Sequence, residues 1–334
     1  MRSHPLLRFA ASALLLLSSM ALSGCVFISA AISPFGGRPE PLEERVVSGQ
    51  GKDKVLLIEI SRVITAEEQE GSFGLRRRES TVANVEEQLQ QAAQDDRVKA
   101  IVLRVNSPGG TVTASDVIYH RLMAFRDQRQ VPIIAHFGDI ATSGAYYVSL
   151  AADEIVASPT SVTGSIGVVM AGINLEGLMS KLGVTNQTIK SGEHKDIGSP
   201  LRKMTPAELA ILQQVLDQMR DRFAGLVRER RPQFAQSDQV DAFTDGRIVT
   251  ADQALDAKLI DRIGYLDEAI AVARGRARLE RARVVMYRRS SEPAENIYSH
   301  AALAAPQVNL VNVDLSGLLP SHAGFLYLWM PGGY

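Results

Sequence analysis

The sequence predicts an α/β fold in which helices cover a largely parallel β-sheet. Two observations lead to this prediction. Short apolar runs rich in valine and isoleucine alternate along the chain with segments of helical periodicity. Several of these runs are almost continuously apolar, which is typical of strands buried on both faces. The chain has 334 residues, which is enough for a large α/β domain with a sizeable core.

The predicted strands begin with the run KVLLIEI and end with ARVVMYR. One of them, VKAIVLRVNSPGG, ends in a Pro-Gly-Gly turn, and the run VPIIAHF leads directly into GDIATSGAYY. In chain order, the predicted strands span Lys54–Ile60, Val98–Gly110, Val131–Phe137, Asp153–Pro159, Thr163–Val169, Thr185–Gly192 and Ala282–Arg288.

Helical periodicity predicts helices between the strands. The clearest start is Thr205-Pro206-Ala207-Glu208, where threonine caps the helix, proline takes the first helical position and glutamate the third. The predicted helices span Thr81–Gln94, Thr113–Asp127, Leu175–Leu182, Thr205–Arg230, Thr250–Gly264 and Leu266–Arg274.

The N-terminal segment is typical of an exported protein. Arg2 and Arg8 precede an apolar run and then small residues, the order that marks a signal peptide. The uncharged run is long enough for a membrane-spanning helix, so an uncleaved anchor is the alternative. The ending Leu-Ser-Gly-Cys resembles the bacterial lipobox, in which Cys25 becomes the lipidated first residue.

We therefore expect a signal peptide over residues 1–24 and a membrane tether over residues 25–53. Lipid chains on Cys25 would hold the protein on a membrane of the bacterial cell envelope, facing the periplasm or the exterior.

Composition excludes several classes of function. The formal net charge of −1 gives no reason to expect a nucleic-acid partner. One cysteine cannot form an internal disulfide or a thiolate zinc cluster. No metal-binding spacing such as H-E-x-x-H is present, so we expect neither a metal nor a cofactor.

Ser143 lies where the strand ending at Phe137 and its following turn lead into a helix. Most serines in this position are helix caps. The context also suits a nucleophile, because the amide of Gly144 could hold developing negative charge. The stretch is not the G-x-S-x-G elbow, since Ala141 and Ala145 replace both outer glycines. The residues alone leave both interpretations open.

A second candidate feature is the turn Asn106–Gly110. Gly109 and Gly110 permit left-handed backbone and let a ligand approach the amide N–H groups. A pair of such groups can form an oxyanion hole. The alternative is an ordinary turn between a strand and a helix.

The sequence offers lysine, rather than histidine, as the candidate base. His120 in a predicted helix and His136 in a predicted strand are best explained as surface or core residues. A lysine must lose its proton to act as a base, and burial lowers its pKa from ~10.4. Lys195 lies on the glycine-flanked loop SGEHKDIGSP, whereas Lys190 lies inside a predicted strand. A solvated charge is the ordinary alternative.

Four motifs together resemble the signal peptide peptidase A family of serine–lysine peptidases. They are NSPGG, ATSGAYYVSLAADEIVA, TGSIGV and SGEHKD, in the family's order and approximate spacing. The resemblance covers roughly residues 55–270 and implies a Clp protease/crotonase-like fold, a spiral of β-β-α units. It implies a single-copy peptidase domain over residues 54–288 and a C-terminal extension over residues 289–334.

The resemblance also implies roles for individual residues. Ser143 matches the nucleophile and Lys195 the general base. The oxyanion donors and substrate-channel residues that it implies are Gly109, Gly110, Gly144, Ser165 and Gly167. Single-copy family members assemble from several subunits, and neighbouring chains can share the serine and the lysine. The resemblance therefore implies a homo-oligomer, an octamer being one possibility. The implied substrates are peptides, above all cleaved signal peptides or other peptides near a membrane.

Two rival functions remain. A crotonase-like enzyme would need a cytoplasmic acyl-CoA pool, and an inactive scaffold of the same fold would show damage at the motifs. The tail Ser290–Tyr334 is poor in charge and ends in GFLYLWMPGGY. We expect this apolar end to pack against a neighbouring chain or to lie in the substrate groove as an inhibitor.

Overall fold

The computed structural model describes residues 40–70, 77–78, 80–236, 240–290, 292–299 and 324–329. The predicted signal peptide, the lipobox with Cys25 and the first part of the tether lie outside the described residues.

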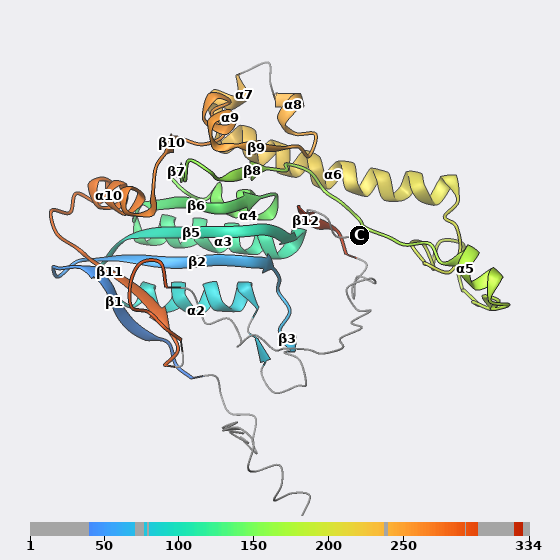
Figure 1. Ribbon diagram of the computed structural model, residues 1–334, viewed down its shortest axis with the longest axis horizontal. Helices are drawn as coiled ribbons and strands as arrows, with labels where there is room; N and C mark the ends of the chain where they lie inside the picture. The colour runs from blue at the N-terminus through green and yellow to red at the C-terminus, as the bar shows by residue number, and fades with distance from the viewer. Residues whose placement is uncertain are drawn as a thin grey trace, which may run out of the picture. The chain divides into compact units, whose positions relative to one another are not determined.

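One mixed sheet organises the described chain (Figure 1). Its main strands, in spatial order, are β1 (Glu43–Gly49), β11 (Arg283–Arg288), β2 (Lys54–Ile64), β5 (Val98–Thr111), β6 (Ile133–Thr142), β7 (Glu154–Ala157) and β10 (Arg262–Ile263). From β11 to β10 all neighbours are parallel, and β1 is antiparallel to β11. The predicted α/β class with a largely parallel sheet is therefore confirmed.

Short strands extend the sheet near the carboxyl ends of β5 and β6. β8 (Val162–Gly164) runs parallel to β6, and β9 (Ile248–Thr250) pairs antiparallel with β8. β12 (Leu326–Leu328) pairs antiparallel with β5. A separate two-stranded ribbon consists of β3 (Gln69–Glu70) and β4 (Arg77–Arg78).

Helices cover both faces of the sheet. One face carries α2 (Thr81–Ala93), α3 (Val112–Arg129) and α4 (Gly144–Ser149), and the other carries α10 (Leu266–Arg276). Because side chains alternate along a strand, Leu56 and Ile58 of β2 pack toward α2 and α3, whereas Val55 and Leu57 pack toward α10. Burial on both faces explains the nearly continuous apolar run of β2.

A long excursion leaves the sheet after β8. It contains α5 (Glu176–Lys181) and leads into α6 (Pro206–Arg230), which begins with the predicted capping box. The backbone N–H of Glu208 donates to the Thr205 hydroxyl at 3.2 Å, and the Glu208 carboxylate accepts from the Thr205 N–H at 2.8 Å. Residues 172–205, called the arm below, are all described, and none of them is buried.

Three short helices, α7 (Pro232–Ala235), α8 (Val240–Phe243) and α9 (Ala251–Asp256), complete the described elements between α6 and β10. The last of them is shorter than the predicted helix over Thr250–Gly264, because the chain turns at residue 257 to supply β10.

Two sequence predictions differ from the structure. β1 lies inside the predicted tether, because its partner β11 is more than 200 residues away and no local pattern announces the pairing. The predicted strand Thr185–Gly192 is wrong: this segment lies in the arm without a strand partner, and Ile189 is 98% exposed. Alternating residues there resemble a strand, but none of the described strands pairs with them.

Candidate active site

Ser143 occupies a strained backbone position between β6 and α4. Its φ of 54° and ψ of −117° lie in a region that residues other than glycine rarely adopt. Such a conformation costs about 1–3 kcal/mol and persists only where the surroundings enforce it. The Ser143 side chain does not cap α4, so the interpretation as an ordinary helix cap is not supported.

The Ser143 hydroxyl is buried and unpaired. The residue is 1% exposed, and its Oγ has no hydrogen-bond partner among the described residues. Buried hydroxyls usually find a partner, so an unpaired one requires an explanation, and a catalytic role is one. The backbone around it is held: the Ser143 N–H donates to Gly164 O at 2.8 Å, and the Tyr147 N–H donates to Ser143 O at 2.9 Å.

The predicted oxyanion glycines converge next to this serine. Gly109 has a φ of +103°, and a Cβ added to it would lie 2.8 Å from the Gly144 nitrogen. A Cβ on Gly144 would lie 3.1 Å from the Gly110 nitrogen. Side chains at these positions would therefore fill the space between the amides. The Ser107 hydroxyl, which the sequence did not single out, accepts from the Gly109 N–H at 3.1 Å.

The segment TGSIG forms the other wall of the serine turn. Gly164 and Ser165 have φ values of +85° and +53°, and the Ser165 N–H donates to Arg247 O at 2.7 Å. β8 therefore ends at Gly164, before the predicted end of this strand, and Ser165 and Gly167 line the adjacent pocket.

β12 lies across the glycine turn. Its backbone pairs Tyr327 with Gly110 and Leu328 with Gly109. Flanking hydrogen bonds join Trp329 N–H to Pro108 O at 2.9 Å and Val112 N–H to Phe325 O at 3.3 Å. Because bonded pairs alternate along an antiparallel ladder, the Gly110 amide faces the Tyr327 carbonyl. The same carbonyl oxygen lies 3.0 Å from the position of a Cβ on Gly144.

β12 is also bonded on its other side. The Val169 N–H donates to Leu326 O, and the Leu326 N–H donates to Val169 O, both at 3.0 Å. An extended peptide thus lies between β5 and the segment that follows Gly167. The sequence predicted that the apolar tail docks, and this part of the tail docks at the candidate site; residues 330–334 lie outside the described residues.

The Tyr327 side chain fills a hole between α4 and α6. It is 0% exposed, stacks on Tyr147 with 5.3 Å between ring centroids, and lies 4.7 Å from the Phe223 ring. Its hydroxyl donates to Met219 O at 2.9 Å. Burial raises the pKa of Tyr327, so the phenol stays protonated as a donor.

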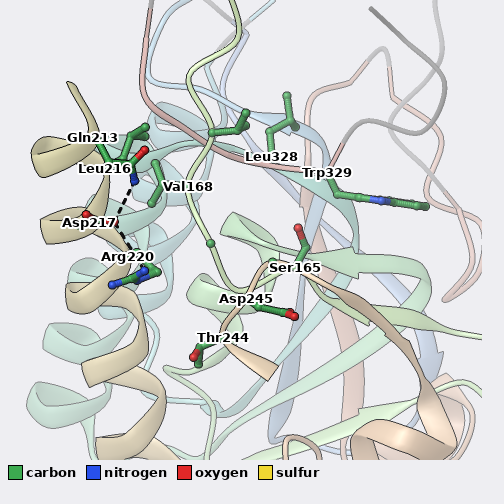
Figure 2. A pocket seen from close by; sticks show the side chains of 13 residues that line it. Ser165, Val168, Gln213, Leu216, Asp217, Arg220, Thr244, Asp245, Leu328 and Trp329 are labelled. Carbon is green, nitrogen blue, oxygen red and sulfur yellow. Dashed lines mark hydrogen bonds and ion pairs between the residues drawn. The ribbon is translucent and has the colours of Figure 1, made fainter. Parts of the chain in front are cut away.

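A pocket of about 580 Å³ lies beside β12 (Figure 2). Figure 2 shows α6 side chains on one side, with Leu328 and Trp329 of the tail on another. Its polar lining residues include Ser165, Gln213, Asp217, Arg220, Thr244 and Asp245. This pocket lies next to an extended peptide and has both apolar and charged walls. It can therefore accept peptide side chains of different kinds.

The structure does not bring Lys195 to Ser143 within one chain. Lys195 is exposed on the arm, and Ser143 Oγ has no hydrogen-bond partner among the described residues. The neighbouring Lys190 donates to Asp196 at 2.8 Å. Within the described residues of one chain, no lysine side chain therefore bonds to the Ser143 hydroxyl.

The described histidines do not supply a base. His136 lies on the face of β6 that carries Ile134, toward α10, with its Nε2 3.3 Å from Ser158 Oγ. Burial lowers the pKa of His136 to about 4, and the nearby Arg104 guanidinium adds to the lowering. His120 and His194 are exposed. No group of His, Cys, Asp and Glu within the described residues is arranged to hold a metal ion.

Comparison with known proteins identifies the families that the chain resembles. A family model described as Clp protease matches residues 72–161, and one described as Peptidase family S49 matches residues 125–280. A solved structure of a ClpP1 mutant from Listeria monocytogenes is 17% identical, with a TM-score of 0.41 over 64% of this chain and 94% of that chain. The two family models place the chain among the serine peptidases with a Clp protease-like fold.

Relatives define the family more closely. "Putative signal peptide peptidase SppA" of Enterococcus faecium is 34% identical over 254 residues, 76% of this chain and 72% of that protein. Protease 4 of Salmonella typhi is 36% identical over 58% of this chain, but this match spans 31% of its length. The chain belongs to peptidase family S49, as the motifs predicted.

Proposed function

We propose that this serine peptidase is a membrane-anchored endopeptidase in which Ser143 is the nucleophile and Lys195 of a neighbouring copy is the general base. The observation that carries the proposal is the Ser143 turn: a strained, buried and unpaired hydroxyl beside converging glycine amides. Strain of this kind keeps a hydroxyl pre-positioned for attack.

The chemistry would be acyl transfer. Neutral Lys195 removes the Ser143 proton, and Oγ attacks the carbonyl carbon of a peptide bond. The amides of Gly110 and Gly144 hold the resulting oxyanion. The protonated lysine then gives its proton to the leaving amine, and a water molecule, activated by the lysine, releases the peptide acyl group from Ser143.

The arm supports a shared site. Its exposed apolar side chains resemble an uncovered interface. A second copy of the chain is the expected partner, because its own Ser143 also lacks a lysine. These side chains, with those at the start of α6, are Ile173, Leu178, Leu182, Val184, Ile189, Leu201, Leu209 and Ile211. A buried interface would also remove Lys195 from water, and burial favours the neutral amine that a base requires.

The substrate would bind as an extended strand against β5. β12 follows this path in the structure, with the Tyr327 carbonyl facing the Gly110 amide. Signal peptides have an apolar central segment, which suits a groove that already holds the apolar strand β12. We further propose that β12 is a self-inhibitor that an incoming peptide displaces.

Membrane attachment would come from Cys25. Lipid on Cys25 would anchor the N-terminal end of the tether in the membrane, and the tether would keep the domain near the bilayer of the cell envelope. Within the described part of the chain, the helices are all too short or too polar to cross a membrane.

The test is hydrolysis of casein and of a synthetic apolar signal peptide by the chain that starts at Cys25. Ser143→Ala and Lys195→Ala should each abolish turnover while leaving the oligomer intact by light scattering. Turnover that survives Ser143→Ala would contradict the assignment of the nucleophile. Intact binding of peptide without hydrolysis in the unmodified chain would favour an inactive binding protein.

A further inference from the structure

The loop that carries Lys195 is attached to α6 by one arginine. The guanidinium of Arg202 lies between Asp196, directly after Lys195, and Glu208 in the first turn of α6. Nε donates to Asp196 Oδ2 at 2.8 Å and Nη2 to Asp196 Oδ1 at 2.6 Å. Nη1 and Nη2 donate to Glu208 Oε2 and Oε1 at 2.8 and 2.5 Å. Two bidentate, charge-assisted contacts thus join the loop to the helix.

These contacts replace apolar packing in the arm. All of the arm is described, and none of its residues is buried, so it has no hydrophobic core of its own. In contrast, the side chains of Asp196 and Glu208 are 14% and 2% exposed. The shape of the loop therefore depends on its polar contacts.

Asp196 is the centre of the loop. Successive turns surround it, with Lys195 N–H donating to Gly192 O at 3.2 Å and Ser199 N–H donating to Asp196 O at 3.0 Å. Lys190 Nζ donates to the Asp196 carboxylate as well. Because Lys195 and Asp196 are adjacent in the chain, a shift of the Asp196 carboxylate moves the lysine.

Both carboxylates remain ionised at ordinary pH. The hydrogen bonds from Arg202 lower the pKa of Glu208 to about 2 and that of Asp196 well below its usual range. The ion pairs of Arg202 with Asp196 and Glu208 therefore persist at every pH at which a lysine could act as a base.

We propose that Arg202 is a positioning residue that fixes where Lys195 projects from the arm. This inference rests on the proposed role of Lys195. A general base must come within hydrogen-bond reach of its proton, and a misplacement of about 1 Å can cost about a hundredfold in rate. Lysine cannot replace Arg202, because an ammonium cannot bridge two carboxylates bidentately.

The experiment compares Arg202→Gln and Arg202→Lys in the full assembled enzyme with Arg228→Gln, an exposed arginine at the far end of α6. We expect kcat to fall about ten- to a hundredfold in both Arg202 variants. KM should stay within about twofold, since the groove is untouched. Hydrogen exchange should become faster at residues 190–203 alone, and Arg228→Gln should resemble the unmodified enzyme.

Three results would overturn the inference: kcat within about twofold of normal in Arg202→Gln, full activity in Arg202→Lys, or loss of the oligomer in both, which would assign Arg202 to assembly. Lys195→Ala is measured in parallel. If Lys195→Ala remains active, the proposed base itself is wrong. If Lys195→Ala is inactive but Arg202→Gln has normal kcat, only the positioning role fails.

Discussion

Ser143 shows how a single residue can carry a cost to the fold. Its backbone conformation suits glycine, and its buried hydroxyl lacks a partner among the described residues. Neither feature helps folding, since strain and an unpaired polar group both destabilise. The surrounding bonds from Gly164 and Tyr147 hold the turn in place. A costly conformation maintained by its neighbours is consistent with a site selected for reactivity.

The strain at Ser143 predicts an unusual order of stabilities. The free energy of unfolding of Ser143→Gly should be about 1 kcal/mol higher than that of Ser143→Ala. Glycine adopts this backbone conformation without strain, whereas alanine does not. Both variants should be inactive. Urea titrations of the two proteins measure the difference. A glycine variant less stable than the alanine variant would mean that the turn is not strained.

His136 predicts a pH dependence of stability. Its folded pKa of about 4 lies below the ordinary unfolded value of about 6.5, so the folded state binds fewer protons between these values. Its contribution to stability is present above about pH 6.5 and is lost as pH falls toward 4. The loss amounts to about 3 kcal/mol.

Thermal unfolding of the protein and of His136→Gln between pH 4 and 7 measures this term. The difference in stability between the two proteins should shift in favour of His136→Gln as pH falls. A pH-independent difference would show that His136 titrates normally in the fold.

At the scale of elements, β12 is the strand that links the tail to the site. The Tyr327 ring packs against Tyr147 of α4 and Phe223 of α6, and its hydroxyl donates to a backbone carbonyl of α6. Its own carbonyl faces the Gly110 amide. α6 therefore contacts the tail through Met219 and Phe223 and contacts the lysine loop through Glu208 in its first turn. Displacement of β12 would open the groove and also leave the aromatic hole free for a substrate side chain.

Deletion of residues 325–334 tests the role of β12. If the strand is an inhibitor, kcat/KM for a short peptide should rise several-fold, while thermal stability falls because Tyr327 leaves a buried hole. Tyr327→Ala keeps the strand but empties the hole, so it should weaken inhibition with a similar loss of stability. Unchanged activity and assembly after the deletion would contradict occupation of the groove.

At the scale of the whole molecule, the single chain holds half of each proposed site. Ser143 is buried in the sheet domain, whereas Lys195 is exposed on an arm with uncovered apolar side chains. Assembly would therefore cover an apolar surface and complete the chemistry in the same step. Dissociated monomers should be stable but inactive.

Mixing two inactive variants tests sharing directly. Ser143→Ala and Lys195→Ala chains, refolded together in equal amounts, should recover about one quarter of the activity, because one neighbour pair in four combines both intact residues. Each variant alone should give none. A mixture that stays inactive, with mixed oligomers confirmed by mass spectrometry, would mean that serine and lysine come from the same chain.

The amino-acid sequence by itself determined the elements whose causes are local. Apolar runs predicted β2, β5 and β6, the capping box predicted the start of α6, and four motifs identified the S49 family. These features depend on residues close together in the chain, so a local pattern contains them. Only the tertiary structure revealed the pairing of β1 with β11, the placement of Tyr327 at Gly110, and the exposure of Lys195 on the arm. Each of these depends on contacts between segments distant in sequence. Burial and strand pairing determine such contacts, so local periodicity cannot predict them.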